Sequence, residues 1–138
     1  MFKWLLVAPF AGFILFNAYV YGSIITYRAV APHSTAFMSM RMNELRDDKP
    51  DVKLDYRWVP YHDISVNLKK ALIASEDAKF AEHGGFDWSG IQNAIKRNHK
   101  SGKLKAGGST ISQQLSKNLF LNERRSYFRK VEEAAITA

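Results

Sequence analysis

The chain has 138 residues, with 20 Lys and Arg against 13 Asp and Glu, and a formal net charge of +7. This length allows one modest domain at most, and a sequence without cysteine excludes disulfide bonds and thiolate metal sites. The basic excess indicates an anionic partner, which can be nucleic acid, lipid headgroups or a phosphorylated substrate. We expect no nucleic acid, because the aromatic residues do not alternate with the basic ones as they do in base-stacking surfaces.

The first predicted element is a membrane-spanning helix. The stretch from Trp4 to Tyr27 has no charged residue, and roughly 24 helical residues extend about 36 Å, which exceeds the hydrocarbon core of about 30 Å. A cleaved signal peptide would have a shorter apolar region, of about 7–15 residues, that ends in small residues. We therefore favour an uncleaved anchor with a short tip over residues 1–28. The balance of Lys and Arg on its two sides does not decide its orientation.

Few helical signals follow from residue 29 to about residue 62. This region contains three of the four prolines and scattered charges. We interpret residues 29–55 as a stalk or linker, and Val52 to Trp58 as a short strand or extended segment.

Helical signals then become regular. Ser65 is a good N-cap for a helix, and Gly84 and Gly85 stop this helix or the turn after it. Asp87 can cap a second helix. The apolar positions at helical spacing are Leu68, Ala71, Leu72 and Ala78 in the first helix, and Ile91, Ala94 and Ile95 in the second.

The segment "KRNHKSGKLKAGGS" has no apolar period and predicts a basic loop. Ser109 or Thr110 caps a third helix, and Ser126 opens a fourth that runs to the end of the chain. On the third helix, Ile111, Leu115 and Leu119 are expected on one buried face. The prediction is a mostly α-helical protein.

The start of the third helix resembles a phosphate-binding loop but fits neither the P-loop nor the dinucleotide pattern. Thr110, Gln114 and Lys117 share a face near its N-terminus, where free N–H groups and the helix dipole favour an anion. A phosphate cradle and a capped, solvated helix are equally good interpretations of this segment alone.

Two further groups carry chemistry. Arg129 and Glu133 are four residues apart, which fits either a surface ion pair worth about 0.3–0.5 kcal/mol or a phosphate-binding Arg129 oriented by Glu133, which can alternatively bind a metal. Glu76 ends an apolar helix, with Phe80 and His83 expected on the same face, so it is a candidate general acid or base. His83 can equally cap the helix end.

Three blocks, "SEDAKFAEHGGFD", "GGSTISQQLSKNLFL" and "RKVEEA", resemble in order and spacing the first three motifs of the biosynthetic peptidoglycan glycosyltransferases. This family occurs as the N-terminal domain of class A penicillin-binding proteins and as a stand-alone, membrane-anchored enzyme, to which "YRWVPYHDISVNLKKALIASEDAKF" is most similar. The resemblance implies an incomplete, C-terminally truncated lysozyme-like α-helical glycosyltransferase domain over residues 56–138, because later family motifs do not follow.

The family's activity is the polymerisation of lipid-linked disaccharide-peptide (lipid II) into glycan strands, with release of undecaprenyl pyrophosphate. By motif position, the resemblance implies that Glu76 is the catalytic base and Glu133 the second family glutamate. The residues that it implies around the substrate are Asp77, Phe80, His83, Gly108, Ser109, Thr110, Gln113, Gln114, Lys117, Asn118, Arg129 and Lys130.

The resemblance also implies a divalent cation, Mg²⁺ or Mn²⁺, and no organic cofactor. The expected partners are lipid II, the nascent glycan strand, the inner membrane and proteins of cell-wall synthesis or division. The expected location is the bacterial inner membrane, with a cytoplasmic amino terminus and a periplasmic catalytic part.

Two alternatives remain open. A glycan-cleaving muramidase or lytic transglycosylase would use Glu76 as a protonated acid in an apolar pocket. An inactive membrane-anchored fragment would bind anionic lipid or a protein partner through its basic loop, at Lys103 and Lys105.

Overall fold

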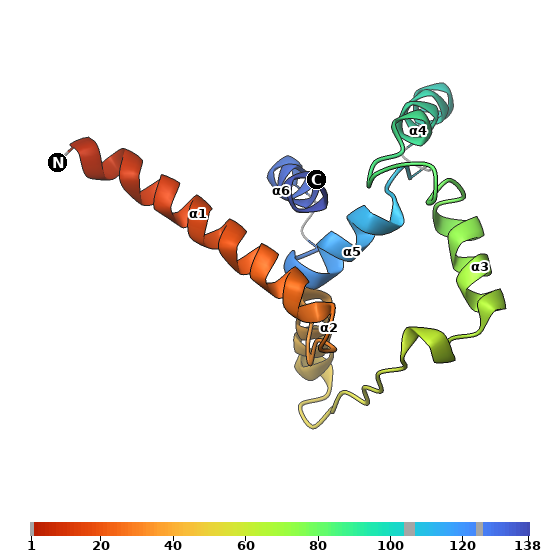
Figure 1. Ribbon diagram of the computed structural model, residues 1–138, viewed down its shortest axis with the longest axis horizontal. Coiled ribbons are helices and arrows are strands. Elements are labelled where there is room, and N and C mark those ends of the chain that lie inside the picture. Colours follow the sequence, from red (N-terminus) through yellow and green to blue (C-terminus); the bar gives the residue numbers. More distant parts are fainter. Residues whose placement is uncertain (1, 104–106, 124–125) are drawn as a thin grey trace. The chain divides into compact units, whose positions relative to one another are not determined.

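The computed structural model describes residues 2–103, 107–123 and 126–138. Within these ranges it contains six α-helices, one short 3-10 helix and no β-strand, which confirms the mostly α-helical prediction. The chain divides into two compact units, one up to Thr35 and one from Ala36 onward. Each unit is described separately below (Figure 1).

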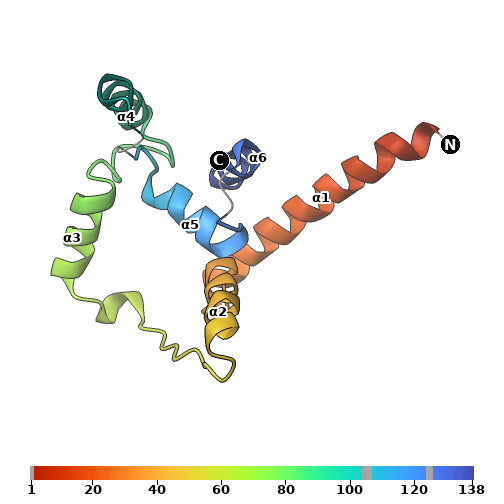
Figure 2. The same cartoon turned by 180° about the vertical axis from the view of Figure 1, so that it is seen from behind.

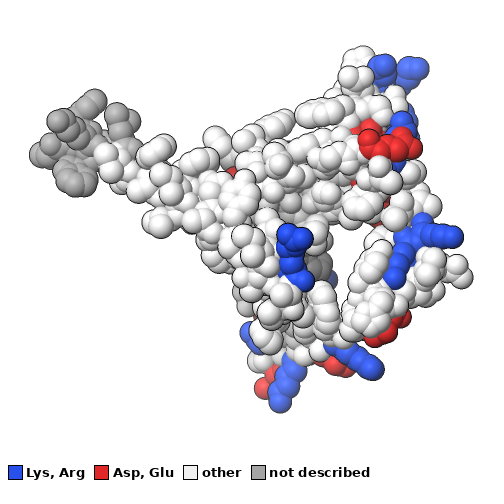
Figure 3. All heavy atoms as spheres, in the orientation of Figure 1, with Lys and Arg blue, Asp and Glu red and all other residues white. Residues whose placement is uncertain are grey.

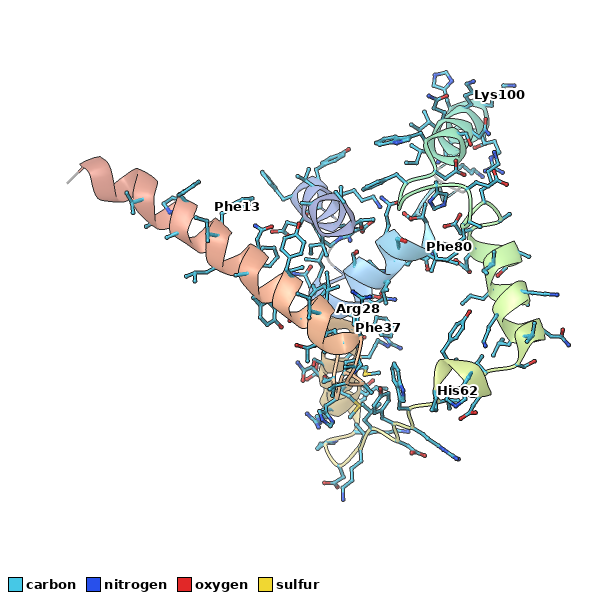
Figure 4. The ribbon with its side chains drawn as sticks, in the orientation of Figure 1. Phe13, Arg28, Phe37, His62, Phe80 and Lys100 are labelled. Carbon is cyan, nitrogen blue, oxygen red and sulfur yellow. The ribbon has the colours of Figure 1, made fainter. Side chains whose placement is uncertain are left out.

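The N-terminal unit consists mainly of helix α1, Phe2–Tyr27. Its segment Val7–Tyr27 has 21 residues, which extend about 31 Å at 1.5 Å per residue and match the thickness of a hydrocarbon core. This segment carries no charged side chain (Figure 3), and most of its large side chains, such as Phe13, project into the surroundings (Figure 4). The helix is therefore long and apolar enough to cross a membrane, as expected.

Two polar side chains within α1 form hydrogen bonds with the helix itself. Asn17 Nδ2 donates to the carbonyl of Phe13, and Thr26 Oγ1 donates to the carbonyl of Gly22, both at 2.8 Å. Such bonds to the preceding turn lower the cost of placing polar groups in a hydrocarbon phase.

The second unit begins with a helix in the region where few helical signals were expected. Helix α2 runs over Ala36–Asp48, so the weak helical signals of this region did not predict its helix, and the role of residues 29–55 as a stalk or linker stays a prediction. Its Met, Leu, Glu and Arg residues are good helix formers, Arg41 and Glu44 form an ion pair of 2.5 Å across one turn, and the helix packs against α5 with Met42 buried. Residues 52–60 form neither helix nor strand, and the 3-10 helix Tyr61–Asp63 follows.

The four helices expected in the second half of the chain are confirmed. They are α3 (Val66–Glu76), α4 (Trp88–Ser101), α5 (Ile111–Phe120) and α6 (Tyr127–Thr137). Figure 2 shows the same helices from behind.

Most of the expected N-caps are in place. Asp87 accepts a 2.9 Å hydrogen bond from the amide of Gly90, and Ser126 accepts one of 3.1 Å from the amide of Arg129, whereas Ser65 precedes α3 without a side-chain capping bond. Helix α4 continues to Ser101, so the first half of the expected basic loop is helical.

The buried faces differ from the expected ones. Leu68 and Leu72 of α3 are exposed, and so are Ile95 of α4 and Leu115 of α5, whereas Ala94 is buried as predicted. Helix α5 packs against α2 and α6 and buries two polar side chains, Gln113 and Ser116. Periodicity shows which side chains share a face, but it does not show which face another element covers.

Candidate active site

Glu76 is the last residue of α3, and its carboxylate is exposed. Gln114, on α5, donates a 2.8 Å hydrogen bond from Nε2 to Oε2 of Glu76. Among the described residues, Oε1 of Glu76 has no hydrogen-bond partner. A carboxylate that is held by one oxygen and open at the other suits a general base, because the open oxygen can reach the hydroxyl of a bound sugar.

The next residue, Asp77, is buried and joins three parts of the chain. Its Oδ1 lies 2.9 Å from Nε2 of His83, and its Oδ2 accepts a 3.1 Å hydrogen bond from the backbone amide of Ile111, the first residue of α5. Asp77 therefore links the end of α3 and the turn that follows it to the N-terminus of α5.

Phe80 and His83 do not continue the face of α3, because the helix ends at Glu76 and they lie in the turns that follow. The two rings meet edge to face, with centroids 6.3 Å apart, and Phe80 lies near the end of α3 (Figure 4). The alternative that His83 caps the helix end is wrong, since its ring bonds to Asp77 and to the amide of Gly85.

The N-terminus of α5 has a reciprocal capping box. Thr110 Oγ1 accepts from the amide of Gln113 at 3.2 Å, and Gln113 Oε1 accepts from the amide of Thr110 at 3.1 Å. Together with the Asp77 contact to Ile111, these bonds use the amides of Ile111 and Gln113. The expectation of free first-turn amides is therefore wrong for these two residues. Phosphate binding by side chains of this helix stays a prediction.

Gly108, in the segment before α5, packs closely against α4. A Cβ atom added at this position would lie 3.0 Å from Cα of Ile91 and 3.3 Å from Cβ of Ala94. Only a glycine allows this approach without displacement of the α4 backbone, so the segment before α5 is positioned by direct contact with α4.

Glu133 is the most deeply buried charged residue of the described chain, at 2% exposure. Its Oε2 accepts a 2.8 Å hydrogen bond from Arg129, and its Oε1 bonds to the ammonium group of Lys130. Lys130 also donates to Ser109 Oγ at 3.0 Å. The ion pair considered above is therefore a cluster of one buried carboxylate and two cations, and one of these cations, Lys130, also contacts the segment before α5.

A cleft of about 220 Å³ lies between the end of α3, the start of α4 and the segment before α5. Sequence reasoning missed Lys79, Asp87 and Arg97 as cleft residues. The hydroxyl of Ser89 and the amide of Gly90 bond to Asp87 and hold its pKa below the usual value of 3.8. Of these three missed residues, only Lys79 had a signal in the sequence, namely its position three residues after Glu76. The lining consists of Glu76, Asp77, Ala78, Lys79, Asp87, Gly90, Arg97, Gly107, Gly108, Ser109 and Thr110.

A second cleft of about 220 Å³ also involves Gly108 and Ser109, and it contains Lys130 and Gln113 together with apolar residues of α4. Lys117 and Asn118 are half-buried on later turns of α5 and line neither cleft. The two clefts thus bring together residues of all three sequence blocks.

Two carboxylates of this site, Asp77 and Glu133, have no oxygen left for a divalent cation. Both oxygens of Asp77 accept hydrogen bonds, and both oxygens of Glu133 bond to cationic side chains. No cluster of three or more His, Asp or Glu residues suited to a metal occurs in the described ranges. The alternative in which Glu133 binds a metal is therefore not supported by the geometry.

This geometry defines a helical domain that presents an open carboxylate beside a cleft and a cluster of cations on a neighbouring helix. The Transglycosylase family model matches residues 43–138, a range that begins within α2. The chain therefore belongs to the transglycosylase family.

Relatives with the name biosynthetic peptidoglycan transglycosylase cover almost the whole chain. The protein of Neisseria meningitidis serogroup C (strain 053442) is 77% identical over 136 residues, which are 99% of this chain and 58% of the relative. That of Neisseria gonorrhoeae is 74% identical over the same shares. That of Azoarcus sp. (strain BH72) is 48% identical over 140 residues, 99% of this chain and 61% of the relative. The chain thus spans about three fifths of the length of these relatives.

Proposed function

We propose that this chain carries the catalytic base of a peptidoglycan glycosyltransferase, which polymerises lipid II into glycan strands and releases undecaprenyl pyrophosphate. The observation that supports this proposal is the contact between Glu76 and Gln114 at the cleft, which joins two family motifs and leaves one carboxylate oxygen open. The family match and the names of the relatives support the same activity.

In the proposed reaction, Oε1 of Glu76 accepts the proton of the 4-hydroxyl group of the acceptor sugar. The oxygen of that hydroxyl forms a bond to the anomeric carbon of the growing chain, with inversion. The bond from this carbon to the lipid pyrophosphate breaks, and the pyrophosphate leaves with the electron pair. Gln114 holds Oε2, so the carboxylate keeps one orientation throughout the proton transfer.

Positive side chains would stabilise the leaving pyrophosphate, whose negative charge grows in the transition state. Arg129 and Lys130 are two cations held by one carboxylate, and Lys117 has an ammonium group without a partner in the described part of the chain. A divalent cation, Mg²⁺ or Mn²⁺, stays part of the proposal, but Asp77 and Glu133 have no oxygen free to hold it. No step of the reaction above depends on it.

The proposed location is the inner membrane, with α1 as the anchor, the amino terminus in the cytoplasm and the catalytic part in the periplasm. The length and composition of α1 support an anchor. The proposed partners are lipid II and the nascent strand, together with proteins of cell-wall synthesis or division.

The geometry gives less support to the muramidase alternative. A muramidase needs a protonated acid in an apolar pocket, but the cleft at Glu76 has Lys79, Asp87 and Arg97 in its lining. For the lipid-binding fragment, Lys105 of the expected basic loop lies outside the described residues.

The test is polymerisation of lipid II in detergent. We would compare the 138-residue chain with a chimera that continues into the C-terminal part of the Neisseria meningitidis relative, each with and without Glu76→Gln. We expect the substitution to lower the rate by at least about 100-fold, the lower range for loss of a general base. The exposed Glu82→Gln serves as the matched control and should leave the rate unchanged. An equal rate for wild type and Glu76→Gln would contradict the role of Glu76, and release of soluble fragments from cell wall without lipid precursor would favour the muramidase.

A further inference from the structure

Asp77 and His83 form a buried pair beside the proposed catalytic base. Only 3% of the Asp77 side chain and 10% of the His83 side chain are exposed, and Asp77 Oδ1 lies 2.9 Å from His83 Nε2. The resemblance implied that both residues contact substrate, but buried side chains whose polar atoms bond to protein have little capacity left for a ligand.

The surroundings of His83 determine which ring nitrogen carries the proton. The backbone N–H of Gly85 points at Nδ1 of His83, 3.2 Å away. Because a backbone amide can only donate, Nδ1 must accept and carries no proton. The ring proton is therefore on Nε2, where it is donated to Asp77 Oδ1, and His83 is a neutral imidazole in the Nε2–H tautomer.

Gly85 is itself held in place, so this constraint on His83 is firm. Its carbonyl accepts a 2.6 Å hydrogen bond from Thr110 Oγ1, and its φ of 105° is a conformation that favours glycine. A Cβ added at Gly85 would also lie 3.3 Å from Thr137 of α6.

Asp77 is constrained in the same way. Its Oδ2 accepts from the amide of Ile111, and its Oδ1 accepts from His83, so both neighbours are donors. Asparagine cannot replace it, because its NH₂ group would face either the Ile111 N–H or the proton on His83. One turn beyond Ile111, Gln114 bonds to Glu76. The position of this amide at Glu76 thus depends on the anchoring of the first turn of α5 by Asp77.

We propose that Asp77 and His83 are positioning residues that do not contact substrate: neutral His83 fixes the orientation of Asp77, and Asp77 fixes α5 so that Gln114 holds Glu76. This inference rests on the proposed function, since it assigns the pair to the alignment of the base.

The first test does not need turnover. ¹⁵N NMR of the histidine-labelled chain at pH 8 reports four histidines, and His83→Gln identifies the signal of His83. We expect Nδ1 without a proton and Nε2 with one. A proton on Nδ1 would overturn the proposal. We also expect the side-chain amide signal of Gln114 to shift in Asp77→Asn but not in Glu82→Gln, and an unchanged signal in Asp77→Asn would likewise contradict it.

The second test separates positioning from binding in whichever chain polymerises lipid II. Gln at position 83 can extend its amide N–H to Asp77, whereas Asn is too short and can only accept from Gly85. We expect His83→Gln to stay within about threefold of wild type, and His83→Asn and Asp77→Asn to lose about 100-fold in kcat through misalignment, with little change in KM. A rise in KM at constant kcat would indicate a substrate contact, and equal losses for His83→Gln and His83→Asn would also refute the positioning role. If neither the 138-residue chain nor the chimera polymerises lipid II without substitutions, the proposed function fails. The NMR result still decides whether His83 and Asp77 form the proposed hydrogen bond.

Discussion

Removal of the charge of Glu133 is expected to destabilise the second unit strongly. The side chain of Glu133 is 3% exposed, and it bonds to Arg129, which is 16% exposed, and to Lys130, which is 46% exposed. In Glu133→Gln the oxygen can accept from one of the two cations, but the NH₂ group then faces the other. The substitution therefore removes the negative charge to which both Arg129 and Lys130 are bonded.

The size of the effect follows from this burial. Breaking a buried ion pair by removal of one partner costs about 3–5 kcal/mol. Lys130 is half exposed and can regain water, which places the expected loss at the lower end, about 3 kcal/mol. For a domain of roughly 100 residues, each kcal/mol changes Tm by about 4–8 °C. We therefore expect Tm to fall by about 12 °C or more.

The assay is thermal unfolding of the chain in detergent, followed by circular dichroism. Glu132→Gln is the matched control, because it makes the same change at an exposed position of the same helix, and its Tm should stay within about 2 °C of wild type. A Tm of Glu133→Gln that is equally close to wild type would refute the reasoning, since it would mean that the cluster is solvated in solution.

Gly108→Ala should lower the free energy of unfolding by about 1–3 kcal/mol, because the new Cβ would press on the backbone of Ile91. Denaturant unfolding measures this change. The control is Gly107→Ala, which should be neutral because a Cβ at this position meets open space. A loss of equal size at both positions would contradict the packing argument. Asp87→Ala should lower Tm at neutral pH through loss of the bond to the amide of Gly90. Because the pKa of Asp87 is lowered in the folded state, its contribution is present above the usual value of 3.8 and is lost as the pH falls below it. The Tm difference between Asp87→Ala and wild type should therefore shrink on acidification, and a difference that grows would contradict the assignment.

The contacts of Asp77 change the interpretation of anion binding at α5. A helix N-terminus attracts negative charge through its free amides, but here the first amide of α5, that of Ile111, already donates to the carboxylate of Asp77. A pyrophosphate would then be bound mainly by side chains, with Lys117 on α5 and Arg129 and Lys130 on α6 as the cations. Binding by side chains rather than amides would make affinity for the precursor depend strongly on salt.

The features that sequence predicted correctly depend on neighbours along the chain. Thr110 caps α5, Asp87 caps α4 and Ser126 caps α6, because a capping side chain bonds to an amide only two or three residues away. The apolar stretch of α1 is equally local, since its length and composition alone decide whether it can cross a membrane. The order of the three motifs, which indicated the family, is likewise read directly from the residues.

The tertiary structure decided everything that depends on which surfaces meet. Leu115 and the polar Gln113 lie on the same short helix, yet Leu115 is exposed and Gln113 is buried, because contacts with α2 and α6 determine the covered face. The bond from Asp77 to Ile111 spans 34 residues, and no periodicity reports it. From the sequence, Glu133 could be half of a surface ion pair, the partner of a phosphate-binding Arg129 or a metal ligand, and only packing shows that it is buried. Local hydrogen bonds and hydrophobic length can be derived from the chain itself, whereas burial and long-range bonds depend on how the helices pack in space.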